Sequence, residues 1–378
     1  MRRASDADRE RLHETFAALC RIESPSGQER ECADWVTQRL RELGLEVEED
    51  DAGARAGSSA GNLLARSPGA GERSILICTH LDTVPPLAPI EPVLVDGGWE
   101  NANQGILGAD NKAAVAVALE LARGLSRRTQ RPPVGVELLF TVCEEVSLRG
   151  SREFDASRLR SRFGYVFDHA SPIGEIVLAS PTHYRIAAEF HGRAAHAGIR
   201  PETGRSAVAA AARAIAAMRL GRLDPETTAN VGTIAGGSGI NVVPEHCRLE
   251  AEARSLDPDK AEEVATEMVD HLQDAADAAE CDLDVTVERM FEGYRTRARA
   301  ESVVLAEHAL EACGYTPSHI TTGGASDANS LNAAGFLCTN LANGTERNHE
   351  PGERVSVDAL EGMLEVAIAL TRGEPAGG

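Results

Sequence analysis

The stretch Ile75–Asp82, ILICTHLD, is an apolar run that stops at a histidine and an aspartate. It predicts a buried strand over 74–78, with His80 and Asp82 where the strand leaves the sheet. Side chains two residues apart point the same way in extended backbone, so both can face one site. A carboxylate beside an imidazole fixes its tautomer and strengthens it as a metal ligand. Taken alone, the pair is also typical of a strand end with two solvated polar residues.

Two other apolar strands end in the same way. An expected strand at 134–142 is followed by Glu144 and Glu145, and one at 163–167 is followed by Asp168. Adjacent carboxylates at the end of a buried strand repel each other unless cations or a proton neutralise them. One of them can therefore bind metal while the other handles a proton. Because the carboxyl ends of parallel strands meet at one edge, we expect a mainly parallel sheet with its site there.

Two further candidates lie outside these strands. Asp110 precedes 112–125, a segment so rich in alanine, valine and leucine that we expect a buried helix. An isolated aspartate at that position is also typical of a simple N-cap. His349 lies in the polar loop 344–353. Together with the strand-end residues, these side chains supply two imidazoles and enough carboxylates to hold two divalent ions, with one carboxylate bridging them.

The element order changes after residue 180, where an antiparallel pattern begins. The chain is too long for one ordinary core, at 378 residues, so two domains are expected. The order βαββαβ predicts a small ferredoxin-like α+β domain at 181–289, inserted into an α/β domain of residues 1–180 and 290–378. Its expected elements are strands at 184–190, 229–234, 248–254 and 283–288 and helices at 207–218 and 261–279.

Local signals predict individual turns and helix starts. Ser26–Glu29 has the pattern of a capping box that opens a second helix, and Asp358 is expected to cap the last helix. A small hairpin is expected around Asp96 and Gly97.

Composition excludes several classes of function. The formal charge of −21 disfavours nucleic acid and anionic membranes as partners. No apolar leader follows the first residues, and no apolar run approaches the length that a membrane span requires. The eight cysteines show no CxxC spacing, as expected of reduced thiols. These features together predict a cytoplasmic protein.

Nine motifs occur in the order of a known family: THLDTV, LGADNKAA, CEE, FDH, HGRAAHAG, GINVVPE, EARSLD, GGASDAN and NHEPGE. On these motifs the chain resembles the di-zinc metallopeptidases and amidohydrolases that include peptidase T, glutamate carboxypeptidases, aminoacylases and succinyl-diaminopimelate desuccinylase. Asp168 and the motif HGRAAHAG make it most similar to the peptidase T branch. The loop NHEPGE departs from the HGKHE-type loop of the best-known tripeptidases, so the preferred peptide length stays open.

The resemblance implies a site with two Zn²⁺ per subunit, for which Co²⁺ or Mn²⁺ can substitute. Asp82 would orient His80, and Glu144 would be the general base for the attacking water. The peptide bond between Asp110 and Asn111 would be cis. The implied metal ligands are His80 and Asp168 for one zinc, Glu145 and His349 for the other, and Asp110 bridging both.

The same resemblance makes the inserted domain a dimerisation or lid domain. His196 would stabilise the oxyanion and contact the substrate, and Asn241 and Arg254 would hold the substrate. From the residues alone, these three are equally a surface histidine, a turn asparagine and a strand-end arginine. In size the domain resembles the dimerising version of this family, and the resemblance implies a homodimer in which His196 would serve the partner's metal site. The remaining histidines considered are expected to be structural or surface residues: His169, His183, His191 and His246.

The expected function is hydrolysis of short peptides with release of the N-terminal amino acid. An N-acyl amino acid amidohydrolase or a carboxypeptidase of the same fold is the first alternative. A non-catalytic binding protein on a hydrolase scaffold is the second.

Overall fold

The computed structural model describes residues 4–127 and 132–372 of the chain. The chain divides into two compact units, which we call the large unit (Met1–Ala179 with Thr296–Gly378) and the small unit (Ser180–Arg295). In the described part of the chain, no helix combines the length and the apolar character needed to span a bilayer.

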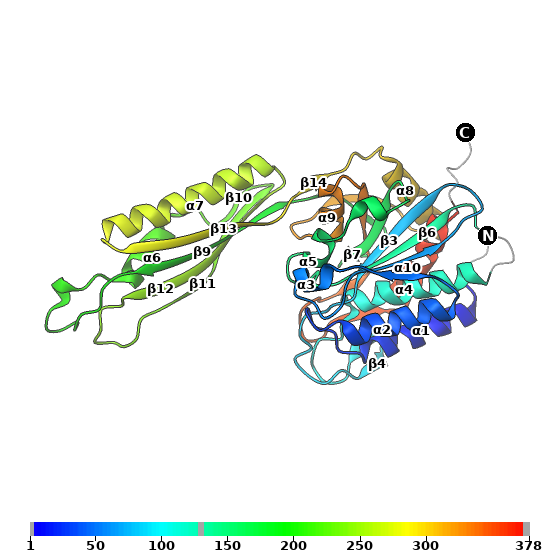
Figure 1. Ribbon diagram of the computed structural model, residues 1–378, viewed down its shortest axis with the longest axis horizontal. Helices are drawn as coiled ribbons and strands as arrows, with labels where there is room; N and C mark the ends of the chain where they lie inside the picture. Colours follow the sequence, from blue (N-terminus) through cyan, green and yellow to red (C-terminus); the bar gives the residue numbers. More distant parts are fainter. Residues whose placement is uncertain (1–3, 128–131, 373–378) are drawn as a thin grey trace. The chain divides into compact units, whose positions relative to one another are not determined.

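The large unit is built on a mixed sheet flanked by helices, which confirms the predicted α/β class (Figure 1). Its central strands β6, β3 and β7 lie side by side and parallel, and β16 continues in parallel beside β7. The strands, in sheet order, are β1 (Val47–Glu49), β2 (Leu63–Ser67), β6 (Gly135–Thr141), β3 (Ser74–His80), β7 (Gly164–His169), β16 (Cys338–Ala342) and β8 (Glu175–Ser180), with β15 (Ser318–Thr321) beside β8.

Helices cover both faces of this sheet. The helix α4 is buried almost all round and packs on β3, on the face of Ile75 and Ile77, as its apolar composition predicts. The helix α9 packs on the other face of β3, where Asp327 Oδ2 lies 3.8 Å from Cys78 Sγ. The helices of this unit are α1 (Asp6–Cys20), α2 (Arg30–Glu42), α3 (Ala52–Ala56), α4 (Ala109–Ser126), α5 (Arg149–Arg152), α8 (Glu301–Cys313), α9 (Asp327–Ala333) and α10 (Val357–Leu370).

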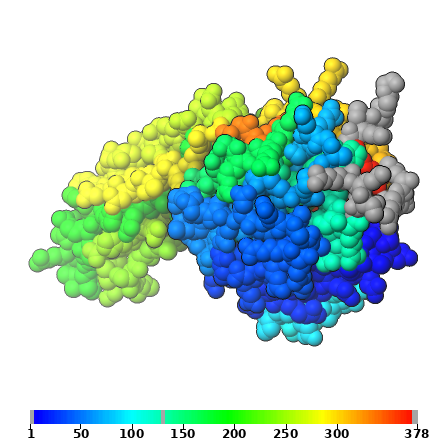
Figure 2. Space-filling view, turned by 45° about the vertical axis from the view of Figure 1, so that its right-hand side comes forward, coloured from blue at the N-terminus to red at the C-terminus, as the bar shows by residue number. Residues whose placement is uncertain are grey.

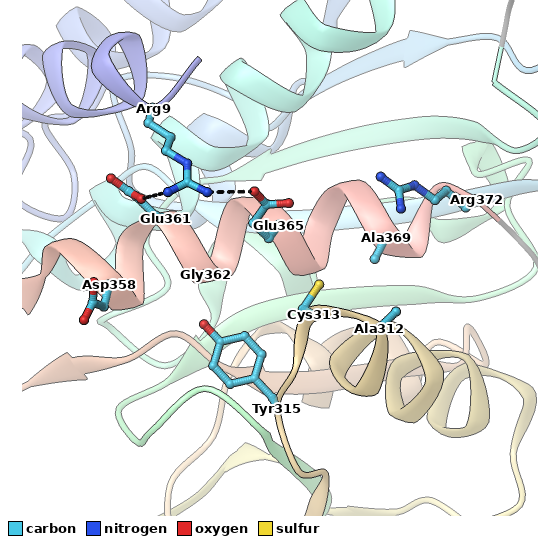
Figure 3. Close-up of a pocket in the computed structure, with 10 residues that line it drawn as sticks. All are labelled: Arg9, Ala312, Cys313, Tyr315, Asp358, Glu361, Gly362, Glu365, Ala369 and Arg372. Carbon is cyan, nitrogen blue, oxygen red and sulfur yellow. Dashed lines mark hydrogen bonds and ion pairs between the residues drawn. The ribbon is translucent and has the colours of Figure 1, made fainter. Parts of the chain in front are cut away.

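Ion pairs tie the first helix to the last. Arg9 on α1 donates to Glu361 at 2.7 Å and to Glu365 at 3.3 Å, both on α10 (Figure 3). Gly362, one residue after Glu361, leaves no room for a Cβ because the Tyr315 hydroxyl packs directly against it. The helices α1 and α2, drawn in blue in Figure 2, lie at the surface of the large unit. The helices α1 and α10, far apart in the sequence, therefore belong to one packed body.

A small second sheet carries the loop that contains His349. The predicted hairpin at Asp96 and Gly97 is present between β4 and β5, and β18 pairs with β5. The strands β17 and β18 pair with each other, so they hold the two ends of the loop 347–353 together. These strands are β4 (Pro92–Val95), β5 (Gly98–Asn101), β17 (Thr345–Glu346) and β18 (Arg354–Ser356).

The small unit is an antiparallel sheet with two helices on one face. Its order along the chain contains the predicted βαββαβ pattern and one additional short strand, β10. Alternate residues such as Ile186, Phe190 and Leu249 are buried against the helices, and the residues between them lie on the open face. The strands, in sheet order, are β10 (Gly221–Asp224), β11 (Thr227–Gly236), β12 (His246–Ser255), β9 (Thr182–His191) and β13 (Asp282–Phe291); the helices are α6 (Ala207–Ala217) and α7 (Pro258–Ala278), and β14 (Tyr294–Arg295) follows.

Two predicted helix caps are wrong. The helix α2 begins at Arg30, and Glu29 makes no side-chain cap there. Glu29 is buried instead, and its carboxylate accepts the backbone N–H of Cys143 at 3.1 Å. Cys143 lies in the turn that follows β6, where its N–H has no partner in the described part of the sheet. The helix α10 is capped by Ser356, whose hydroxyl accepts the N–H of Ala359. Ser356, two residues before Asp358, is therefore the N-cap, and Asp358 lies within the first turn of the helix.

Candidate functional site

Seven of the predicted site residues lie together in the large unit. The strands β6, β3 and β7 are adjacent and parallel, so their carboxyl ends present their polar residues at one edge. The start of α4 and the loop 347–353 supply the two remaining groups. The residues are His80, Asp82, Asp110, Glu144, Glu145, Asp168 and His349.

Asp110 lies between the two imidazoles of this cluster. Its Oδ1 is 3.4 Å from His80 Nε2, and its Oδ2 is 3.5 Å from His349 Nε2. His80 Nε2 is also 3.5 Å from Asp168 Oδ1, and His349 Nε2 is 3.0 Å from Glu145 Oε2. Two groups of potential metal ligands therefore share Asp110, and within each group the ligand atoms lie within 4.8 Å of one another.

Asp82 contacts His80 and the backbone N–H groups of Glu144 and Glu145. Its backbone carbonyl is 2.9 Å from His80 Nδ1, whereas its carboxylate is 3.5 Å from that nitrogen. The carboxylate accepts the Ser26 hydroxyl at 2.7 Å and the backbone N–H groups of Glu144 and Glu145 at 2.9 and 3.2 Å. Asp82 thus orients His80 mainly through its backbone and uses its side chain to fix the turn after β6.

Glu144 differs from its neighbour Glu145. Burial raises the pKa of Glu144 well above its usual value, and the carboxylate of Asp168 raises it further. Glu145 contacts His349, whereas the Glu144 carboxylate takes no hydrogen bond within the described ranges. A buried carboxylate with a raised pKa and no committed partner is suited to accept and release a proton.

The charges of the cluster fit divalent cations. Burial raises the pKa of Asp168 well above its usual value, with the carboxylate of Asp110 adding to the effect. Burial opposes ionisation of Asp110 too, but the imidazoles of His349 and His80 hold the pKa of Asp110 below its usual value. Among the residues that the structure describes, its Oδ1 is buried and has no hydrogen-bond partner. Five carboxylates against two imidazoles leave an excess of negative charge, which cations bound among these oxygens and nitrogens would neutralise.

Residues that the sequence reasoning missed hold the ligands in place. Glu353 accepts the backbone N–H groups of Leu107, Gly108 and Asp110 at 2.9, 2.7 and 2.9 Å, and burial raises its pKa to about 7. Asn111 donates to Asp168 Oδ1 at 3.0 Å. The Asp110–Asn111 peptide bond is cis, which confirms that prediction. Glu353 lies four residues after His349 in the same loop. This closeness to a predicted metal ligand was the one feature of the sequence that could have indicated a role for Glu353 in the site.

The predicted substrate residues all belong to the small unit. His196 and Asn241 are exposed on adjacent loops, where the Ala197 N–H donates to the Asn241 carbonyl at 2.9 Å. Arg254 lies near the opposite end of β12, where it pairs with Glu252 at 2.9 Å. Eight residues of extended strand separate His246 from Arg254, which is about 26 Å. Within one small unit, Arg254 is therefore remote from His196 and Asn241.

Imidazoles and carboxylates that share Asp110, next to the buried carboxylate of Glu144, are the arrangement expected of a metal-dependent hydrolase. Residues 183–280 match the family model described as a peptidase dimerisation domain, and residues 62–196 match that of peptidase family M28. The chain belongs to the family of metallopeptidases that contains aminopeptidase PepT, as its similarity to solved structures and curated relatives shows. The predicted metal-dependent hydrolysis of peptide bonds is confirmed by this membership.

Two solved structures are similar over nearly the whole chain. Aminopeptidase PepT from Bacillus cereus is 37% identical, with a TM-score of 0.88, over 96% of this chain and 98% of that chain. A tripeptidase from Staphylococcus aureus is 32% identical, with a TM-score of 0.92 and the same coverage.

The similar curated proteins include an uncharacterized protein and a probable carboxypeptidase. The uncharacterized protein YqjE of Bacillus subtilis is 34% identical over 95% of this chain and 97% of its own length. A probable carboxypeptidase of Paracoccidioides brasiliensis is 31% identical over 75% of this chain and 71% of its own length.

Proposed function

We propose that this chain is an aminopeptidase that removes the N-terminal amino acid from short peptides. The observation that carries the proposal is Asp110, whose two oxygens face two different imidazoles next to the free carboxylate of Glu144. The aminopeptidase and tripeptidase names of the two similar structures support this choice of substrate. The cytoplasm remains the predicted location, and it agrees with the eight free cysteines.

The ligand groups support two zinc ions, with Co²⁺ or Mn²⁺ as substitutes. His80 and Asp168 would hold one ion, Glu145 and His349 would hold the other, and Asp110 would contact both. When bound, such ions supply positive charge that makes water a stronger acid and stabilises developing negative charge.

The protein's own groups then have separate tasks. Glu144 accepts the proton of the attacking water and delivers it to the leaving amine, for which its raised pKa is suited. Asp82 keeps Glu144 in position through the backbone N–H. His196 donates a hydrogen bond to the substrate oxygen that becomes negatively charged. Asn241 and Arg254 hold the substrate backbone or carboxylate.

The length of β12 supports a site shared between two subunits. An extended tripeptide spans about 10 Å, so one small unit cannot contact it with both Arg254 and the His196–Asn241 end, which lie about 26 Å apart. A homodimer removes this conflict, because Arg254 can come from one subunit and His196 with Asn241 from the partner. The match to a peptidase dimerisation domain supports the same assembly.

The edge of the small sheet offers a surface for that dimer. The strand β10 pairs with β11 only at 227–229, so the outer edge of β11 from 230 to 236 has no strand partner in the described part of the chain. Ile234 on this edge is 49% exposed. An unpaired edge with an exposed apolar side chain is a surface that a second copy can cover by strand pairing.

A substrate panel tests the proposed activity. Tripeptides with a free amino terminus, the same peptides N-acetylated, and N-acyl amino acids are incubated with the zinc-loaded protein, and released amino acids are identified. We expect release of the N-terminal residue from the free peptides and loss of that release on acetylation. A carboxypeptidase, the alternative that the fungal relatives favour, would release the C-terminal residue and tolerate acetylation. Turnover of N-acyl amino acids alone would also overturn the proposal.

A further inference from the structure

A second group of metal-ligating side chains lies on the open face of the small unit. The strands β12, β9 and β13 are neighbours there, and His191 on β9 is directly opposite His246 on β12. Glu189 lies two residues before His191, on the same face. Ligand atoms of Glu189, His191 and His246 all lie within 4.8 Å of one another. Asp284 on β13 completes the group from the other side.

The two imidazoles face each other at a distance that suits a shared ion. His191 Nδ1 is 3.3 Å from His246 Nδ1. Zinc–nitrogen bonds of 2.0–2.1 Å in tetrahedral geometry place two ligand nitrogens about 3.3–3.4 Å apart. The observed separation therefore equals the edge of a zinc tetrahedron.

Asp284 holds His191 in the tautomer that can bind a metal ion through Nδ1. Its Oδ2 is 3.0 Å from His191 Nε2, so it accepts the proton on that nitrogen. The lone pair is then left on Nδ1, the nitrogen that faces His246. A carboxylate that fixes the tautomer of a histidine in this way is the usual support of a zinc-bound imidazole.

We propose that Glu189, His191 and His246 bind one zinc ion, distinct from those of the large unit, with Asp284 as the positioning residue for His191. Three protein ligands leave the fourth position to solvent, as at other sites of this composition. Arg248, directly opposite Glu189, does not block the site, because its side chain pairs with Glu250 at 3.7 Å.

The ion would hold together the strand ends that carry the substrate loops. The chain leaves β9 at His191 and reaches His196 five residues later, and Asn241 lies five residues before His246. These loops contact each other through backbone hydrogen bonds such as that from the Val243 N–H to the Ala195 carbonyl, at 2.8 Å. A zinc ion between β9 and β12 fastens both loops at their base.

Zinc counting on the full chain tests the site. Wild type, His191→Ala and His246→Ala are dialysed against the same series of free zinc concentrations, and bound zinc per chain is measured. We expect each variant to bind one ion fewer than wild type. His183→Ala is the matched control, because His183 lies on the same strand and face and pairs with Glu252 instead. It should bind as many ions as wild type.

A second variant keeps the test decisive if removal of a histidine disturbs folding. Asp284→Asn preserves size and leaves all three ligands, so it should bind the same number of ions but bind this one about 10- to 100-fold more weakly. Equal zinc counts in wild type and both histidine variants, with circular dichroism showing folded protein, would overturn the site. The two imidazoles would then form an ordinary hydrogen-bonded pair. Because only the difference between chains is counted, the result does not depend on the metals of the large unit.

Discussion

The carboxylate of Asp82 accepts the backbone N–H of Glu144 at 2.9 Å. This bond joins the end of β3 to the turn after β6, so the residue that supports the proposed metal ligand His80 also sets the position of the proposed general base Glu144. The neighbouring bonds to Ser26 and Glu145 share the same carboxylate, which is completely buried.

Replacing Asp82 with asparagine should disturb both of its tasks. An amide offers one acceptor oxygen in place of two, so at least one buried N–H loses its partner, at about 1–3 kcal/mol. We expect lower stability in urea unfolding and weaker zinc binding. Ser26→Ala is the control, because it removes one hydrogen bond and leaves both backbone donors satisfied. If Asp82→Asn behaves like Ser26→Ala in both measurements, the carboxylate does not hold the turn.

Glu144→Gln should keep the bound metals and lose nearly all turnover. The amide has almost the same shape but cannot accept a proton, and loss of a general base costs about 10²- to 10⁴-fold. Metal content and kcat are measured on the same sample. Glu145→Gln is the matched variant, and it should lose metal because Glu145 is the residue in contact with His349. Loss of metal from Glu144→Gln would mean that the roles of the pair are reversed.

Zinc affinity of the metal-free protein should rise with pH. Asp110 and Glu145 raise the pKa of His349 to about 10, so this imidazole carries a proton at neutral pH and must release it to bind metal. Protons compete more strongly as the pH falls, which lowers the affinity. Calorimetry in buffers of different ionisation enthalpy should detect proton release on zinc binding at about pH 7. An affinity independent of pH, without proton release, would show that His349 is not protonated in the metal-free protein at neutral pH and would contradict this prediction.

The proposed sharing of sites between subunits predicts complementation. Glu144→Gln and His196→Ala should each be nearly inactive, the second because loss of one oxyanion donor costs about 10²- to 10³-fold. When the two variants exchange subunits at random, about half of the dimers are mixed and each has one intact site, so activity should return to about a quarter of wild type. No recovery despite demonstrated exchange would show that His196 acts within its own chain.

The sequence predicts the parts of the site that depend on strand ends. His80, Glu144 and Asp168 follow apolar runs, and parallel strands bring their ends together, so their meeting could be foreseen. The contact between the Asp82 backbone carbonyl and His80 could not be predicted, because it depends on the path of the chain after the strand. The pairing of His191 with His246 could not be predicted either. These residues are 55 positions apart in the sequence, and tertiary packing sets the register of their strands.

The most direct test of the proposed two-metal centre uses metal-free protein and a tripeptide with a free amino terminus. The account predicts no release of the N-terminal amino acid without metal and recovery of that release when zinc is added. It also predicts that Asp110→Ala binds two zinc ions fewer than wild type and does not recover, because the carboxylate between His80 and His349 is gone. Full turnover by the metal-free protein, or by Asp110→Ala, would contradict it.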